Sequence, residues 1–170
     1  ERSLTVKNVI SDMAIKASFR RKLYVVKFSS GSGGSVTGER LQTVSHGGDC
    51  SPVRAEALEG YEFTGWREDY TGTENPLTVM NVISSMDIQA NFSQKAYTIE
   101  FIETIGGSMT GDLRQTVFHG ADSIAVTAKP SEDYKFIGWQ GNYEGTENPL
   151  IIKNVTSDMK ISPNFSQQAC

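Results

Sequence analysis

The stretch Tyr134–Leu150 reads YKFIGWQGNYEGTENPL, and Tyr61–Leu77 reads YEFTGWREDYTGTENPL. Both contain Phe-x-Gly-Trp followed, at the same distance, by the hexapeptide Gly-Thr-Glu-Asn-Pro-Leu. The two stretches lie 73 residues apart, and His46 and His119 have the same separation without a gap. Similarity within a chain at a fixed period is the sequence signature of structural repeats. We therefore expect two copies of one small module.

The first 19 residues repeat only part of this pattern. ERSLTVKNVISDMAIKASF (1–19) aligns with ENPLTVMNVISSMDIQANF (74–92) and with ENPLIIKNVTSDMKISPNF (147–165). The alignment predicts four segments, which are the C-terminal hairpin of a preceding repeat (1–19), a first unit (20–92), a second unit (93–165) and a tail (166–170). Units that begin near Leu4 and Leu77, rather than near Tyr24 and Tyr97, fit the same alignment.

The connectors between these segments are short. RRK forms the first three residues of the first unit (20–22), and SQK forms those of the second (93–95). Because neither contains Gly or Pro, neither can act as a long flexible tether. Neighbouring repeats are therefore expected to contact one another and to form a semi-rigid rod.

Within a unit, the residue patterns predict short strands and little helix. Alternation of apolar and polar residues over four to eight positions is typical of half-buried strands, and clusters of Gly, Pro, Asn and Ser are typical of turns. In the second unit, GGSMTG (106–111) is expected to be a turn, and Pro163 is expected to place the closing strand at a sheet edge. The predicted strands are YTIEF (97–101), RQTVFHG (114–120), SIAVTA (123–128), YKFIGW (134–139), LIIKNV (150–155) and MKISPNF (159–165). The fold class is therefore mainly β, built from tandem small antiparallel modules.

The phase of the strand that carries Trp139 raises a separate question. Simple alternation places Phe136 and Gly138 on one face and Trp139 on the other. Either both faces are covered, or a β-bulge at Gly138 turns the indole inward; we favour the bulge. Burying about 200 Å² of tryptophan at about 25 cal/mol/Å² contributes about 5 kcal/mol, and small units are marginal without such a contribution.

Composition excludes several classes of protein. The chain has 170 residues, of which 38% are hydrophobic and 21% charged, as in ordinary globular domains. The net charge is −4 and no basic stripe is present, so nucleic acid is not an expected partner. No apolar run reaches the roughly 18 residues that a membrane-spanning helix needs.

Few residues suggest chemistry. His46 and His119 each stand alone beside Gly, so we expect no metal, no cofactor and no catalytic residues, and hence no enzyme. Cys50 aligns with Ser123, which excludes an essential role in the repeat, while a Cys50–Cys170 bridge stays open. The ligand-binding candidates are Tyr70 and Tyr143, with Asn75 and Asn148 in the same loops. These tyrosines could stack on a sugar, or they could pack over the tryptophan as a lid.

Taken in order, the motifs resemble the divergent InlB B-repeat family, relatives of the Listeria–Bacteroides repeats. The resemblance covers nearly the whole chain, and in the second unit it is carried by Tyr97, Phe101, Gly106, Gly107, Tyr134, Phe136, Gly138, Trp139, Asn148, Pro149, Leu150, Asn154, Val155, Met159 and Phe165. It implies tandem modules in bacterial proteins that are secreted or bound to the cell surface, often adhesins. It also implies a ubiquitin-like β-grasp fold as the alternative architecture, although ADSIAVTAKPSED (121–133) is typical of a strand and not of a helix.

Two functions follow as hypotheses. The first is a non-catalytic stalk or adhesive spacer of an extracellular protein, motivated by the near-identical units and short connectors. The second is a module that binds carbohydrate or a host surface protein through the Trp/Tyr loop.

Overall fold

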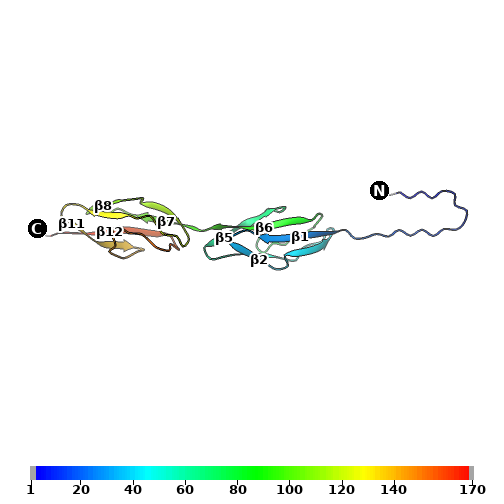
Figure 1. Ribbon diagram of the computed structural model, residues 1–170, viewed down its shortest axis with the longest axis horizontal. Helices are drawn as coiled ribbons and strands as arrows, with labels where there is room; N and C mark the ends of the chain where they lie inside the picture. Colours follow the sequence, from blue (N-terminus) through cyan, green and yellow to red (C-terminus); the bar gives the residue numbers. More distant parts are fainter. Residues whose placement is uncertain (1–2, 169–170) are drawn as a thin grey trace.

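The computed structural model describes residues 3–168 and shows two β modules arranged end to end (Figure 1). The first runs from Leu23 to Gln94 and the second from Ala96 to Gln167, so only Lys95 separates their strands. No helix occurs among the described residues, and the predicted mainly-β class is confirmed. The first module contains β1 (Leu23–Ser30), β2 (Gly34–Thr37), β3 (Leu41–Ser45), β4 (Arg54–Ala57), β5 (Tyr61–Glu68) and β6 (Met86–Gln94). The second contains β7 (Ala96–Phe101), β8 (Gly107–Thr110), β9 (Arg114–Phe118), β10 (Thr127–Pro130), β11 (Tyr134–Gly141) and β12 (Met159–Gln167).

Each module has a four-stranded sheet and a two-stranded sheet. The larger sheets have the orders β3-β1-β6-β5 and β9-β7-β12-β11, and the smaller ones pair β2 with β4 and β8 with β10. All pairs are antiparallel except the central ones, β1 with β6 and β7 with β12, which are parallel. The first and last strands of a module therefore lie side by side at its centre, and the last strand must be in place to complete the sheet.

Each module has a hydrophobic core of its own. In the first, the core surrounds Trp66, which has no exposed surface; in the second, it surrounds Trp139, which is 3% exposed. Aromatic rings meet each indole edge to face, with ring centroids 5.4 Å apart for Phe136 and Trp139. Since the two clusters share no residue, each module can fold around its own tryptophan.

The predicted bulge is present in both modules. The register of β11 on β12 shifts between Phe136 and Gly138, and β5 shifts on β6 between Phe63 and Gly65. Gly65 has a φ of 129°, and a Cβ atom there would lie 2.8 Å from the carbonyl oxygen of Gly72. Glycine is therefore needed at the bulge, both for its backbone conformation and for the close approach of the following loop.

Three predicted elements differ from the structure. GGSMTG was expected to be a turn, but Gly107–Thr110 is strand β8, because it pairs with β10 to build the small sheet. The strand expected over 123–128 begins only at Thr127, where that pairing starts. LIIKNV forms an isolated bridge between Leu150 and Val126 rather than a strand, since Asn154 turns the chain at a φ of 50°.

The expectation that Pro163 marks an edge strand is wrong. β12 lies between β11 and β7, at the centre of the sheet. Its parallel pairing with β7 ends at Ile161, whereas in the first module, where Ala90 replaces the proline, the pairing continues to Ala90 itself. Proline has no N–H to donate. It is accommodated in this central strand because the hydrogen-bond ladder between β12 and β7 stops before it.

Residues 3–22 lie outside both modules. They contain no regular secondary structure and run away from the first module (Figure 1). At the other end β12 continues to Gln167, within the segment expected to be a tail, while residues 169–170 lie outside the described residues. Cys50 is buried, and its suggested partner Cys170 is one of those undescribed residues.

Candidate functional site

The repeated hexapeptide is hydrogen-bonded to the buried tryptophan of its module. The indole Nε1–H of Trp66 donates to the carbonyl oxygen of Glu74 at 2.8 Å, and that of Trp139 donates to Glu147 at 2.7 Å. The backbone N–H of each tryptophan also donates to a loop glycine, Gly72 or Gly145, at 2.7 Å. A buried indole needs a partner for its N–H, and this loop supplies it.

The asparagine side chain of the hexapeptide bonds to the backbone of a strand, as a neighbouring strand would. The Asn148 side chain accepts from the backbone N–H of Ala128 at 2.9 Å and donates to the Ala128 carbonyl at 2.8 Å. Asn75 makes the same two bonds to Ala55, at 3.0 and 2.8 Å. One amide thus satisfies both backbone groups of a β10 or β4 residue, and its Oδ1 and Nδ2 atoms are engaged within the module.

The tyrosine of each loop pairs with the glutamate of the hexapeptide. The Tyr143 hydroxyl donates to a Glu147 carboxylate oxygen at 2.9 Å, and Tyr70 donates to Glu74 at 3.2 Å. The bond to Glu147 is the main cause of the raised pKa of Tyr143, while burial is the main cause for Tyr70. The pKa of the Glu147 carboxyl is lowered, first by its own backbone N–H and then by the Tyr143 hydroxyl.

These contacts define what the loop can offer a ligand. Both tryptophans are buried, so neither face of an indole is open for stacking. Tyr70 and Tyr143 are half-buried against the core and leave part of each ring exposed beside a carboxylate. The structure therefore places Tyr70 with Asn75, and Tyr143 with Asn148, in the same two loops, but with tyrosine as the accessible aromatic group.

A second arrangement, not identified from the sequence, lies between the modules. The backbone N–H of Lys95 donates to the carbonyl oxygen of Gly60 in the first module at 2.8 Å. The Lys95 carbonyl accepts from the backbone N–H of His119 in the second module at 2.9 Å. The Gln94 side chain also donates to the His119 carbonyl, at 3.3 Å. The single connecting residue is thus fixed to both modules by its own backbone.

The imidazole of His119 and the turn at Gly60 are in close contact. A Cβ atom at Gly60 would lie only 2.5 Å from Cδ2 of His119, so the ring fits because the turn residue is glycine. On its other side, Nδ1 of His119 lies 3.3 Å from the hydroxyl of Tyr97. The sequence signal for this contact was available: Gly60 aligns with Asp133, one of the differences between otherwise similar turns.

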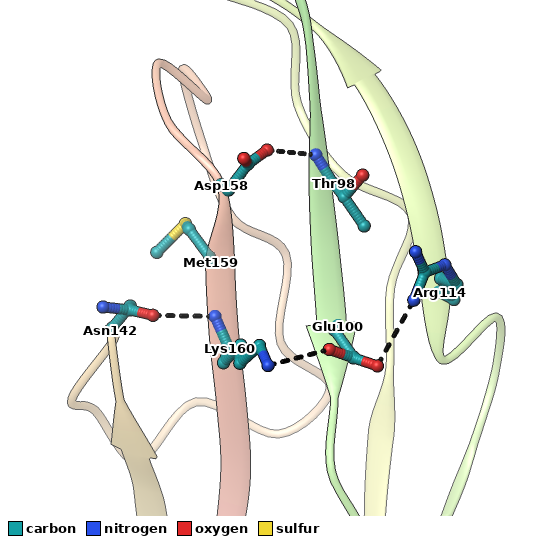
Figure 2. A pocket seen from close by; sticks show the side chains of 7 residues that line it. All are labelled: Thr98, Glu100, Arg114, Asn142, Asp158, Met159 and Lys160. Carbon is teal, nitrogen blue, oxygen red and sulfur yellow. Dashed lines mark hydrogen bonds and ion pairs between the residues drawn. The ribbon is translucent and has the colours of Figure 1, made fainter.

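A surface hollow of about 580 Å³ lies on the large sheet of the second module (Figure 2). Its polar groups are paired with one another: Asp158 accepts from the Thr98 N–H at 2.8 Å, and Asn142 accepts from the Lys160 N–H at 2.7 Å. Glu100 lies between Arg114 and Lys160, at 3.3 and 3.6 Å. These ion pairs are exposed to solvent, where such pairs contribute little.

The same position in the first module has different chemistry. The corresponding hollow measures about 220 Å³ and contains Val25 and Leu41 where the second has Thr98 and Arg114. The charges on the central strands are exchanged, with Lys27 opposite Asp87 and Glu100 opposite Lys160. Charge opposition is retained while the lining changes, which fits stabilisation of the sheet better than a ligand site shared by the repeats.

The described residues offer little for metal chemistry. Between residues 3 and 168, no three His, Cys, Asp or Glu side chains converge on a point that could hold a cation. The Cys50 thiol has a raised pKa, caused first by burial and then by Asp49, so it stays protonated and unreactive near neutral pH. No helix in this part of the chain is long and apolar enough to cross a membrane.

Comparison with known proteins identifies one family. The family model described as the divergent InlB B-repeat domain matches residues 24–96 and again residues 97–169. No curated protein and no solved structure matches the chain. The two matched ranges correspond to the two modules of the structure, each beginning in its first strand.

Proposed function

The chain belongs to the divergent InlB B-repeat family, and from that premise we propose that it is a non-catalytic, semi-rigid spacer of an extracellular bacterial protein, secreted or bound to the cell surface. The family's association with bacterial surface proteins supports this location. The proposal depends above all on the junction, where the Gln94 side chain of the first module donates to the His119 carbonyl of the second and the His119 ring packs on the Gly60 turn.

The physical reason is that a single residue connects the modules and that side-chain contacts between them span it. β6 ends at Gln94 and β7 begins at Ala96, so the chain passes from one sheet to the next with one intervening residue. Rotation about the φ and ψ bonds of Lys95 leaves both Lys95 hydrogen bonds in place, but it would break the bond from the Gln94 side chain to the His119 carbonyl and separate the His119 ring from the Gly60 turn. Such a connection holds the long axes of the modules in a fixed relation and lets repeats add length, as a spacer requires.

We predict that Gly60→Asp releases this junction without unfolding either module. The new side chain would collide with His119, whereas the turn itself accepts aspartate, because Asp133 adopts a φ of 66° at the equivalent position and Gly60 has a φ of 75°. Residual dipolar couplings should give one common alignment tensor for both modules in the native chain. In the variant, the two modules should require different tensors.

The matched control is Asp133→Gly, the reverse exchange at the far turn of the second module. It should leave the common tensor unchanged, since Asp133 takes no part in the contact between the modules. Independent tensors in the native chain would refute the spacer. A common tensor that survives Gly60→Asp would show that the glycine does not govern the junction.

A second function is supported by the repetition of the surface pair of tyrosine and glutamate. We propose as an alternative that Tyr70 and Tyr143 present their exposed ring edges to a glycan or a host surface protein. The bonds of Asn75 and Asn148 would hold the two loops in place for that contact. Two identical weak sites on one rod would bind a multivalent surface with a gain of roughly 10²–10⁴ over one site.

This alternative predicts that Tyr70→Ala combined with Tyr143→Ala abolishes binding on a glycan array or to host cells. Each single variant should lose most of the avidity but retain weak binding. Replacement of both residues by phenylalanine is the control for folding, since it keeps the rings that pack on the core. Binding that the double alanine variant retains in full would contradict the alternative.

A further inference from the structure

The segment Leu4–Phe19 has the sequence of a module's last part but none of its contacts. Its counterparts in the first module bury Leu77, Val82 and Ile88, which are at most 2% exposed. In the segment itself, Leu4 is 72% exposed and Phe19 is 92% exposed. An apolar pattern suited to a core is therefore left in solvent, although solvent exposure of so many large apolar side chains is unfavourable.

The backbone of this segment already has one feature of the folded copies. Asn8 adopts a φ of 54°, and the aligned residues Asn81 and Asn154 adopt 52° and 50°. In the modules this bend is held by a carboxylate, with the Asn81 N–H donating to Asp49 at 2.8 Å. A left-handed residue is uncommon outside glycine, so its presence at the aligned position relates the segment to the closing segments by conformation as well as by sequence.

The segment also joins the first module as β6 joins the second. The His46 N–H donates to the Lys22 carbonyl at 2.9 Å, and the equivalent bond from His119 to Lys95 has the same length. The Tyr24 hydroxyl lies 3.3 Å from Nδ1 of His46, which reproduces the distance between Tyr97 and His119. The end face formed by Tyr24 and His46 is therefore one half of a junction, of which Gly60 and His119 show the completed form.

We propose that Leu4–Phe19 is the closing segment of a further module, and that the Tyr24–His46 face receives the Gly60-type turn of that module. The partner is the first part of a unit of this same kind, equivalent to residues 20–73. In such a unit, residues 13–19 would fill the central position that β6 fills beside β1. The inference rests on the serial packing of the proposed spacer and specifies how a preceding unit is attached.

The test adds a copy of residues 20–73 directly before Glu1, which continues the repeat in register, and follows amide hydrogen exchange in the whole chain. Exchange at Ile15, Ala17 and Phe19 should slow by at least about 10³-fold, as expected when amides open only by unfolding of a stable module. The same addition with Ile15→Asp should leave these amides unprotected and the other two modules intact.

A positive control separates a poor fusion from a wrong proposal. In it, residues 1–19 of the extended chain are replaced by a copy of residues 74–92, the proven closing segment. If that control folds while the natural segment stays unprotected, the proposal is overturned. Protection that appears only at high protein concentration also overturns it, because the strands would then come from another molecule. Amide protection is independent of module orientation, so this result and the alignment experiment can fail separately.

Discussion

Replacing Trp139 with alanine should unfold the second module and leave the first one folded. Loss of a buried aromatic side chain costs about 3–5 kcal/mol, and a domain of about 70 residues has on the order of 4–10 kcal/mol of stability. The substitution also removes the donor to the Glu147 carbonyl, which anchors the hexapeptide loop. Calorimetry should show one transition near its native temperature and a second that is strongly lowered or absent.

Independence of the two modules is what makes this prediction specific. The core around Trp66 shares no residue with the core around Trp139, so the amide spectrum of residues 23–94 should be nearly unchanged outside the junction. Trp66→Ala provides the mirror experiment. Trp139→Phe is the conservative control, because it keeps a ring between Phe101 and Phe136 while it removes the indole bond; it should cost less than the alanine variant. Joint unfolding of both modules in either alanine variant would contradict separate cores.

The burial of the tryptophans was predictable because the sequence shows both the conflict in strand alternation and the glycine that allows a β-bulge to resolve it. Gly65 and Gly138 precede the indoles in strands whose simple alternation would have placed Trp outward, and a bulge resolves that conflict. The two modules were predictable from the 73-residue period. The mainly-β class followed from short alternating runs, which local sequence patterns report well.

Other features depend on distant pairing, which alternation does not report. Nothing local indicates that β1 lies parallel to β6, so the central position of β12 was missed and Pro163 was taken as evidence of an edge. Leu150–Val155 has the composition of a strand, but its backbone bonds go to Ser123, Val126 and Ala121 at intervals, without a continuous ladder. In each case the tertiary partner decided the outcome.

The candidate site shows the same division. The sequence predicted that each tyrosine shares a loop with an asparagine, as in the structure, but not the direction of their side chains. Asn75 and Asn148 were taken as surface donors for a ligand, and the structure shows their amides bonded to Ala55 and Ala128. The contact between Gly60 and His119 went unnoticed because the difference between Gly60 and Asp133 can be interpreted only once the neighbouring module is placed beside the turn.

A buried glutamine in each module was also missed, since glutamine is usually a surface residue. Gln115 is 4% exposed, and its Nε2 donates to the carbonyl oxygens of Asp112 and Ile124, at 2.9 Å each. Its Oε1 accepts from the Ile124 N–H at 2.7 Å. Gln42 makes the equivalent three bonds in the first module. One side chain thus holds the loop that follows β9 against the strand.

We expect Gln115→Glu to destabilise the second module in a manner that depends on pH. The shape is nearly unchanged, but the two donors of Nε2 are replaced by an oxygen that faces two carbonyl oxygens. Burial and these acceptors disfavour the charged form, so the pKa of the new carboxyl should rise in the folded state above the unfolded value of about 4.3. The stability deficit relative to the native chain should therefore be smallest below that value. It should grow by up to about 1.4 kcal/mol per pH unit as the pH rises toward the folded pKa.

At pH 7 the deficit should reach about 3 kcal/mol, the cost typical of an uncompensated buried polar or charged group. Urea unfolding of the native and variant chains at matched pH values between 4 and 8 measures it, and only the transition of the second module should move. Gln140→Glu makes the same change of charge on the exposed part of β11 and should have little effect at any pH. Some cost is expected even at pH 4, because a protonated carboxyl restores only one of the two donors to the Asp112 and Ile124 carbonyls. If Gln115→Glu cost the same at pH 4 as at pH 7, ionisation of the new carboxyl would carry no penalty in the folded module, and the prediction would be wrong.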